Sequence, residues 1–265
     1  MPSVPPEDEM TVGMTVSDPA VVRAFFDGWS LYRRIVDEDY LCHRSVGEAL
    51  GRWLDAREGG FSFLDLGCGD AGFSAALLAG RSVTAYSGMD LSPVALGLAR
   101  DNLEQLGAPF LLTEGDFQRD LSSVQGTFDV VYIGLSLHHL MRREKEGFFP
   151  LLREKVAPGG ALLIFDPVLN PGETRDCYMG RWVDHAEWSW KALSGEDVSR
   201  AVEHVTTSDH PEEIATLNRF ALSAGFHSAE VLFLDRTDFY ALMVFRSDDF
   251  APRPSEGLRG SGGEV

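Results

Sequence analysis

The sequence predicts an α/β fold with a doubly wound, mostly parallel sheet of seven strands, an antiparallel C-terminal hairpin strand and a helical cap. Two observations predict it. Between residues 61 and 165, five short apolar segments alternate with helical patterns, as in parallel strands covered by helices on both faces. Near the end, strand-like segments at 229–234 and 240–246 flank the turn-like stretch DRTD, which indicates a hairpin.

The first half of the chain begins with two helical patterns. Asp18-Pro19 combines a cap residue with a first-turn proline and predicts a helix over 19–36, followed by a second over 39–57. The segment FDVVYI is apolar throughout, as expected for a strand covered on both faces. The predicted strands lie at 61–66, 83–89, 110–113, 128–133 and 161–165, and the helices between them at 72–79, 92–107 and 145–156.

Residues 167–211 interrupt the alternation before a further predicted helix that runs from Pro211 to about Gly225. An irregular block of this length is too long for an ordinary loop and suggests a functional lid. We therefore expect one domain over 19–246 whose cap comes from 19–57 and 167–211. The Pro-rich start, 1–18, and the Gly- and Ser-rich tail, 247–265, are expected to be disordered.

The overall charge is strongly acidic, with 41 Asp and Glu against 23 Lys and Arg, a net charge of −18. Such a chain disfavours nucleic acid and anionic membranes as partners. The three cysteines form no CxxC pair, which argues against a disulfide framework or a zinc site. Because no long apolar run and no signal-peptide pattern occur, we expect a cytoplasmic protein.

A glycine-rich turn follows the first predicted strand. Gly67, Gly69 and Gly72 form a GxGxxG pattern, which lets the backbone approach a nucleotide ligand closely. A dinucleotide needs its pyrophosphate at this turn, yet Asp65 and Asp70 would place negative charge there. The pattern therefore favours a cationic or zwitterionic ligand over a dinucleotide.

Five motifs together resemble the class I S-adenosylmethionine (SAM)-dependent methyltransferases of the small-molecule type. FLDLGCGDAGFS resembles the first motif of that family, although Ala71 stands where a glycine is frequent. Asp90 ends the second strand and Gly115-Asp116-Phe117 follow the third, where the family places its ribose- and adenine-binding acids. FDVVYIGLSLHHL, LREKVAPGGALLIFDP and the terminal strand pair also match in order, so the resemblance covers about residues 40–166 and 212–246.

The resemblance implies a SAM site with the family's division of roles. Asp65 would lie near the methionine amino group, Asp90 would hold the ribose hydroxyls, and Asp116 would bind the adenine amino group. Gly134 or Leu135 would offer a backbone carbonyl. The expected cofactor-binding residues are Asp65, Gly67, Cys68, Gly69, Asp90, Leu91, Asp116, Phe117, Gly134, Leu135 and His43.

Catalytic candidates come from the strand end and from the N-terminal helices. His138 and His139 follow the fourth strand, and we favour His139 as a base, with capping of the next helix as the alternative. Tyr40 and His43 share one helix face. The expected substrate contacts are Tyr32, Trp182, Trp188 and His210, and the alternative is that the tryptophans only anchor the cap.

The predicted reaction is in-line transfer of a methyl group from SAM to an O or N atom of a small molecule, leaving S-adenosylhomocysteine (SAH). Alignment of the reactants is the main requirement of such a displacement. No metal is expected, because the spacing of Asp184, His185, His204, Asp209 and His210 matches no compact ligand pattern. The alternatives are a non-catalytic SAM-binding sensor or partner-binding module and, less favoured, an NAD-type oxidoreductase. We expect a monomer or a homodimer.

Overall fold

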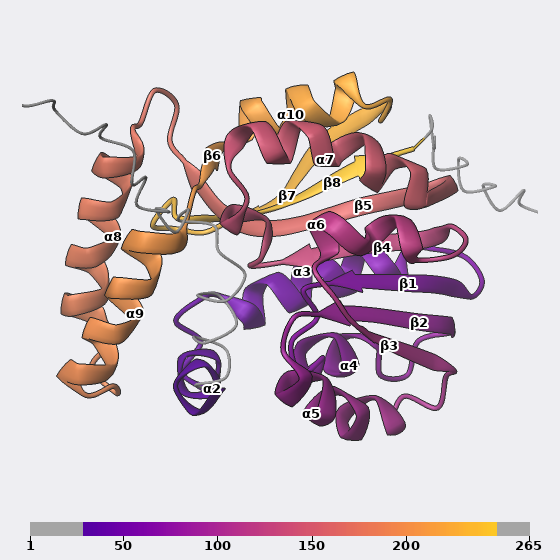
Figure 1. The fold of residues 1–265 in the computed structure, drawn as a ribbon, viewed down its shortest axis with the longest axis horizontal. Helices are drawn as coiled ribbons and strands as arrows, with labels where there is room; N and C mark the ends of the chain where they lie inside the picture. Colours follow the sequence, from indigo (N-terminus) through magenta and orange to yellow (C-terminus); the bar gives the residue numbers. More distant parts are fainter. Residues whose placement is uncertain (1–28, 248–265) are drawn as a thin grey trace, which may run out of the picture.

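The computed structural model describes residues 29–247 and arranges them around one large sheet (Figure 1). The strand order is β3-β2-β1-β4-β5-β8-β7, and the two-residue β6 (Glu212–Glu213) pairs with β5. The main strands are β1 (Phe61–Leu66), β2 (Val83–Asp90), β3 (Phe110–Glu114), β4 (Phe128–Gly134), β5 (Val156–Leu169), β7 (Ser228–Leu234) and β8 (Tyr240–Arg246).

The pairing confirms the predicted doubly wound sheet. β1 pairs in parallel with β2 and β4, and the parallel pairing continues to β3 and β5. β8 runs antiparallel to both β5 and β7, so it is the one reversed strand of the described sheet. The chain order reverses between β1 and β4, which is where open sheets of this type bind ligands.

Two apolar cores cover the two faces of the sheet, because alternate residues of each strand point to opposite sides. Phe63 packs with α3 (His43–Asp55), α4 (Gly72–Leu78) and α5 (Pro93–Glu104). Leu64, its neighbour on β1, packs instead with α7 (Arg142–Lys155) and α10 (Ile214–Ser223). Figure 1 shows α7 and α10 on the upper side of the sheet and α4 and α5 on the lower side.

Several predicted boundaries shift by a few residues. α2 (Trp29–Asp37) is the described part of the predicted helix over 19–36, and its earlier residues lie outside the described range. The next helix starts at His43 rather than at 39. α7 starts at Arg142 rather than 145, because Glu144 accepts a hydrogen bond from the Met141 amide and closes the first turn. A short helix, α6 (Phe117–Asp120), was not expected.

The expectation of an irregular block over 167–211 is wrong. The structure forms two helices there, α8 (Arg175–Ser189) and α9 (Gly195–Ser208), which pack against each other beside α2 (Figure 1). Thr174 and Ser194 cap them by accepting hydrogen bonds from the amides of Cys177 and Asp197. These capping residues were the signal that the sequence reading missed.

The predicted disordered ends fall outside the described residues, apart from Ser247. Among the residues from Trp29 to Ser247, no helix is both long and apolar enough to cross a membrane.

Candidate functional site

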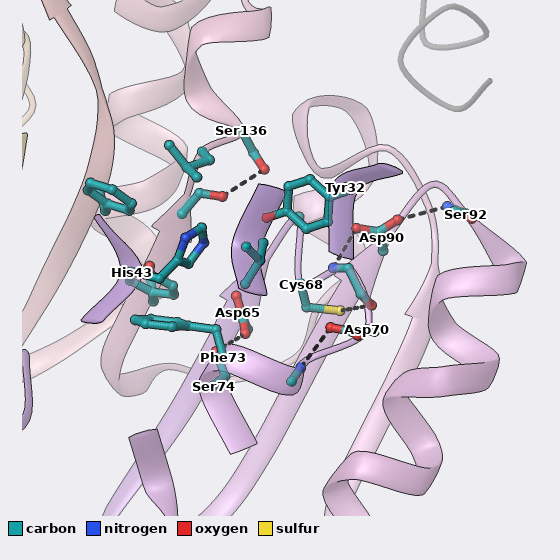
Figure 2. A pocket seen from close by; sticks show the side chains of 18 of the residues that line it. Tyr32, His43, Asp65, Cys68, Asp70, Phe73, Ser74, Asp90, Ser92 and Ser136 are labelled. Atoms are coloured by element: carbon teal, nitrogen blue, oxygen red, sulfur yellow. Dashed lines mark hydrogen bonds between the residues drawn. The ribbon is translucent and has the colours of Figure 1, made fainter. Parts of the chain in front are cut away.

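A cavity of about 340 Å³ opens at the carboxyl ends of β1, β2 and β4 (Figure 2). Asp65 reaches it from β1, Asp90 from the end of β2, and Gly134 from the end of β4. Tyr32 of α2 and His43 of α3 line it from the N-terminal segment. The cavity therefore lies at the reversal of strand order, at the expected edge of the sheet.

The glycine-rich turn forms the floor beside β1, and its glycines are required by geometry. Gly67 has φ +72° and Gly69 has φ +55°, the left-handed region that favours glycine. A Cβ on Gly67 would also lie 2.4 Å from Ser136 Oγ. The amides of Gly67 and Cys68 donate to the Met89 carbonyl at 2.8 and 3.1 Å, which ties the turn to β2.

Two further residues around the cavity hold unusual backbone conformations. Ala71, which stands in place of the frequent glycine, has φ 52° at the start of α4. Leu135, at the end of β4, has φ 49° and lines the cavity. Non-glycine residues in this region are strained and tend to occur at functional sites.

Asp90 connects the turn to the loop that follows β2. Its Oδ2 accepts a hydrogen bond from the Gly69 amide at 2.8 Å, and its Oδ1 accepts one from the Ser92 amide at 2.8 Å (Figure 2). A carboxylate offers about four acceptor positions. Asp90 can therefore hold the turn and still accept hydrogen bonds from a ligand's hydroxyl groups.

Asp65 is only 2% exposed and joins β1 to its neighbours. Its Oδ2 accepts hydrogen bonds from Ser74 Oγ at 2.5 Å and from the Tyr86 hydroxyl at 2.7 Å. Burial raises the pKa of Asp65 to about 6, and repulsion by Asp90 adds to the rise. Among the described residues, the cavity lining also holds Asp37 and Asp70 against the single cation Arg33, so it favours a positively charged ligand.

His43 presents a neutral imidazole to this cavity. Burial lowers its pKa to about 4, and its ring lies edge-on to Phe73 and Phe165 with centroids 5.5 and 6.1 Å away. Its Nδ1 atom is buried and has no hydrogen-bond partner among the described residues. A polar atom left in this state is costly, and a bound ligand would satisfy it.

Ten of the eleven expected cofactor residues line the cavity, and Asp116 is the exception. Its Oδ1 accepts a hydrogen bond from the Gln118 amide at 2.9 Å, and its other oxygen lies 3.4 Å from Arg119. Asp116 therefore caps α6, while Phe117 beside it lines the cavity.

A smaller cavity of about 60 Å³ adjoins the first. Tyr32, Leu135 and His139 line both, so they form a shared wall. The smaller cavity extends toward α8 and α9, where Trp182 lines it and donates from Nε1 to the Tyr240 hydroxyl at 2.8 Å. We refer to the 340 Å³ space as the acidic cavity and to the 60 Å³ space as the inner chamber.

His138 and His139 lie in a short helical turn (Leu137–His139) and do not cap α7, whose cap is Met141. His138 Nδ1 lies 2.8 Å from Asp166 Oδ1, and His138 Nε2 lies 3.5 Å from Asp209 Oδ1. Burial lowers the pKa of His138 to about 3 and holds that of His139 well below its usual value. Both rings are therefore neutral near pH 7.

The sequence reading missed three members of this buried group, namely Asp166, Asp209 as a partner of the histidines, and Lys145. Lys145 is 1% exposed, and its Nζ donates to the Leu140 carbonyl at 2.6 Å and to the His210 carbonyl. Asp166 directly follows the apolar run of β5, at the edge where the site lies, and that position was an available signal.

Tyr40, Trp188 and His210 lie away from both cavities. Tyr40 stacks on Trp190 with ring centroids 4.9 Å apart, and its hydroxyl accepts a hydrogen bond from the Ala192 amide at 3.0 Å. Trp188 is 76% exposed. The His210 amide donates to the His138 carbonyl at 2.7 Å, so this residue supports the buried group through its backbone.

Comparison with known proteins agrees with this geometry. Residues 63–160, which contain the glycine-rich turn and the ends of β1, β2 and β4, match the family described as a methyltransferase domain. These residues form a methyltransferase domain. The fold of the chain is similar to that of magnesium protoporphyrin IX methyltransferase from Synechocystis, a structure with bound SAH, at a TM-score of 0.61 and 17% identity over 87% of this chain and 100% of that one.

Two further proteins are similar to this methyltransferase domain. An O-methyltransferase family protein from Burkholderia thailandensis has a TM-score of 0.55 and 18% identity over 89% of this chain and 73% of that one. The ribosomal protein L11 methyltransferase of Thiobacillus denitrificans is 35% identical over 118 residues, 43% of this chain and 35% of that protein. The chain thus matches about a third of the length of this curated relative.

Proposed function

We propose that the chain is a SAM-dependent methyltransferase that acts on an O or N atom of a small molecule. The observation that carries this proposal is that the acidic cavity and the inner chamber share one wall. The acidic cavity suits a cationic nucleotide ligand, and the inner chamber behind Tyr32, Leu135 and His139 suits a small acceptor.

The residues of the acidic cavity fit SAM, which supplies a methyl group on a positively charged sulfur. Asp90 would accept hydrogen bonds from the ribose hydroxyls, and Phe117 would contact the adenine. Gly67 and Gly69 let the backbone pass close to the ligand. The buried Nδ1 of His43 gains a partner when a polar ligand is bound, and the carboxylates of Asp65 and Asp70 offset positive charge.

The residues of the shared wall support positioning of the acceptor more than strong base catalysis. His139 lies at the shared wall as a neutral imidazole, so a ring nitrogen can take a proton from an acceptor hydroxyl or amine. Because burial lowers its pKa, it would hold that proton only briefly. Tyr32 and Leu135 restrict the approach to one direction, which favours alignment.

A protein acceptor is the second candidate, because the relative from Thiobacillus is named as a methyltransferase of a ribosomal protein. The matched stretch covers 43% of this chain. The small volume of the inner chamber, about 60 Å³, supports a small acceptor over a protein side chain presented on a folded surface.

Two measurements test the proposal. Calorimetry should show binding of SAM and SAH and no binding of NAD; binding of NAD alone would contradict the cofactor assignment. Transfer of a labelled methyl group should then be followed into a metabolite extract and, separately, into a protein fraction. Label in the small-molecule fraction supports the proposal, label only in protein supports the second candidate, and no label in either supports a non-catalytic SAM sensor. In the labelling experiment, the Asp90→Ala variant serves as the control for background label.

A further inference from the structure

His138, His139 and Asp209 bring three potential metal ligands together at the inner chamber. We propose that these residues bind one divalent transition-metal ion. The expectation of no metal rested on the spacing of Asp184, His185, His204, Asp209 and His210. It did not consider His138 and His139 with Asp209, which are about seventy positions apart along the chain. They meet because the turn after β4 packs against the end of α9.

The distances fit a three-ligand site. His138 Nε2 lies 3.5 Å and His139 Nδ1 lies 3.7 Å from Asp209 Oδ1, and the three atoms lie within 4.8 Å of one another. Bonds of about 2.0–2.2 Å to an ion place neighbouring ligand atoms about 3.0–3.5 Å apart. Binding of an ion would draw the three atoms closer together than their present separations of up to 4.8 Å and would replace the 3.5 Å contact between His139 Nδ1 and the Ser208 carbonyl.

The state of the Asp209 side chain is a second observation that points to a bound ion. Its side chain is almost fully buried, and its Oδ1 atom has no hydrogen-bond partner among the described residues. A buried carboxylate oxygen without such a partner is costly. An ion between Asp209 and the two rings would satisfy this oxygen and balance its charge.

Asp166 contacts the ring nitrogen of His138 that does not face Asp209. Its Oδ1 lies 2.8 Å from His138 Nδ1, and when the ionised carboxylate accepts a hydrogen bond from Nδ1, the lone pair of Nε2 is left toward Asp209. A carboxylate that orients a metal-binding histidine in this way is a common feature of such sites. The positive charge of Lys145 is directed to the carbonyls of Leu140 and His210.

The ligand set indicates which ions would bind. Two imidazoles and one carboxylate suit Zn²⁺, Fe²⁺ or Co²⁺, whereas Mg²⁺ and Ca²⁺ prefer oxygen ligands alone. Three protein ligands leave coordination positions open, and the three residues line the inner chamber. If the proposed function holds, an oxygen atom of the acceptor would be the ligand for such a position.

Titration of the tag-free chain with Co²⁺ tests the site, because bound Co²⁺ has a visible absorption spectrum, and Zn²⁺ competition gives a second reading. We expect one ion per chain and affinity at least about 100-fold lower in Asp209→Asn and in His139→Gln. His185→Gln, which removes a half-buried histidine of α8 outside the cluster, should bind as the original chain does. Absence of binding in the original chain, or unchanged binding in both cluster variants, would overturn the proposal.

Asp166→Asn adds a finer test, since loss of an orienting carboxylate should weaken metal binding about 10- to 100-fold without removing it. Circular dichroism verifies that each variant is folded. Calorimetry with SAM separates the two proposals: SAM binding without metal binding overturns the metal site alone, and metal binding without SAM binding overturns the proposed function alone.

Discussion

The acidic cavity and the inner chamber share a wall, yet they are built differently. In the acidic cavity, Asp90 is held by backbone amides of Gly69 and Ser92, so short segments of chain define the site. At and behind the wall of the inner chamber, buried side chains meet from the turn after β4, from α7, from β5 and from the end of α9. Asp90 thus depends on local conformation, whereas the group around the inner chamber depends on buried charge contributed by distant parts of the chain.

This difference predicts which kind of substitution each site tolerates. The backbone amides that hold Asp90 stay in place when neighbouring side chains change, whereas a buried group of charges is destabilised when any member is removed. The inner chamber should therefore be the more fragile of the two and should affect the stability of the whole domain.

The largest expected effect tests that fragility. Lys145→Ala leaves the carbonyls of Leu140 and His210 without their buried donor and removes the cation near Asp166, whereas Asp209 keeps Arg175 nearby. The free energy of unfolding should fall by about 3–5 kcal/mol, measured by urea denaturation. Arg143→Ala, at an exposed position of the same helix, should change it by less than about 0.5 kcal/mol. Equal effects would show that the buried group beside the inner chamber is no more fragile than the protein surface.

Substitutions in the acidic cavity should change the affinity for SAM. Asp90→Ala removes the acceptor of two backbone hydrogen bonds and of the proposed ribose contacts. SAM binding should weaken about 100-fold, or about 2.7 kcal/mol, as measured by calorimetry. Asp116→Ala should change it less than about threefold, because Asp116 caps α6 outside the cavity. A large loss with Asp116→Ala would restore the adenine-binding role expected from the sequence.

A pH profile tests the charge of the cavity. Since the pKa of Asp65 is raised to about 6, the side chain ionises as the pH rises from 5 to 7. The affinity for SAM should increase about tenfold over that range, while His43, with a pKa of about 4, stays neutral.

The same shift has the opposite sign for stability. Folding favours the protonated form of Asp65. The stability that Asp65 contributes is therefore fully present below pH 3.8, the ordinary pKa of an aspartate. This contribution to the free energy of unfolding is lost as the pH rises through about 6. In Asp65→Asn the affinity for SAM should be independent of pH between about 5 and 7. A profile that remains steep in this variant would assign the titration to another group.

The smallest effect concerns the attachment of the cap. Tyr40→Phe removes the hydroxyl that accepts a hydrogen bond from the Ala192 amide and leaves the stacking on Trp190 in place. The free energy of unfolding should fall by about 0.5–1.5 kcal/mol, while SAM affinity stays the same. Trp188→Ala, at an exposed position, is the control for stability. A loss of methyl transfer without a loss of stability would instead support the catalytic role of Tyr40.

The same contrast explains what could be predicted from the sequence. The sheet and the glycine-rich turn follow from local patterns, because strand hydrophobicity, glycine conformation and the position of Asp90 all depend on nearby residues. The grouping of His138 with Asp166 and Asp209 depends on tertiary packing, and no local pattern encodes it. The helices α8 and α9 lie between these cases. Their caps, Thr174 and Ser194, stand in the sequence, but the break in the strand-helix alternation over 167–211 suggested an irregular lid.

The acidic lining has a consequence for turnover under the proposed function. The reactant carries a positive sulfur and the product a neutral thioether, so the ligand loses one positive charge during the reaction. Asp65, Asp70 and Asp90 line the cavity throughout, and their attraction for the ligand therefore drops once the methyl group has left. The spent cofactor should leave more readily than the fresh cofactor does, which would limit product inhibition and make exchange between the two dependent on ionic strength.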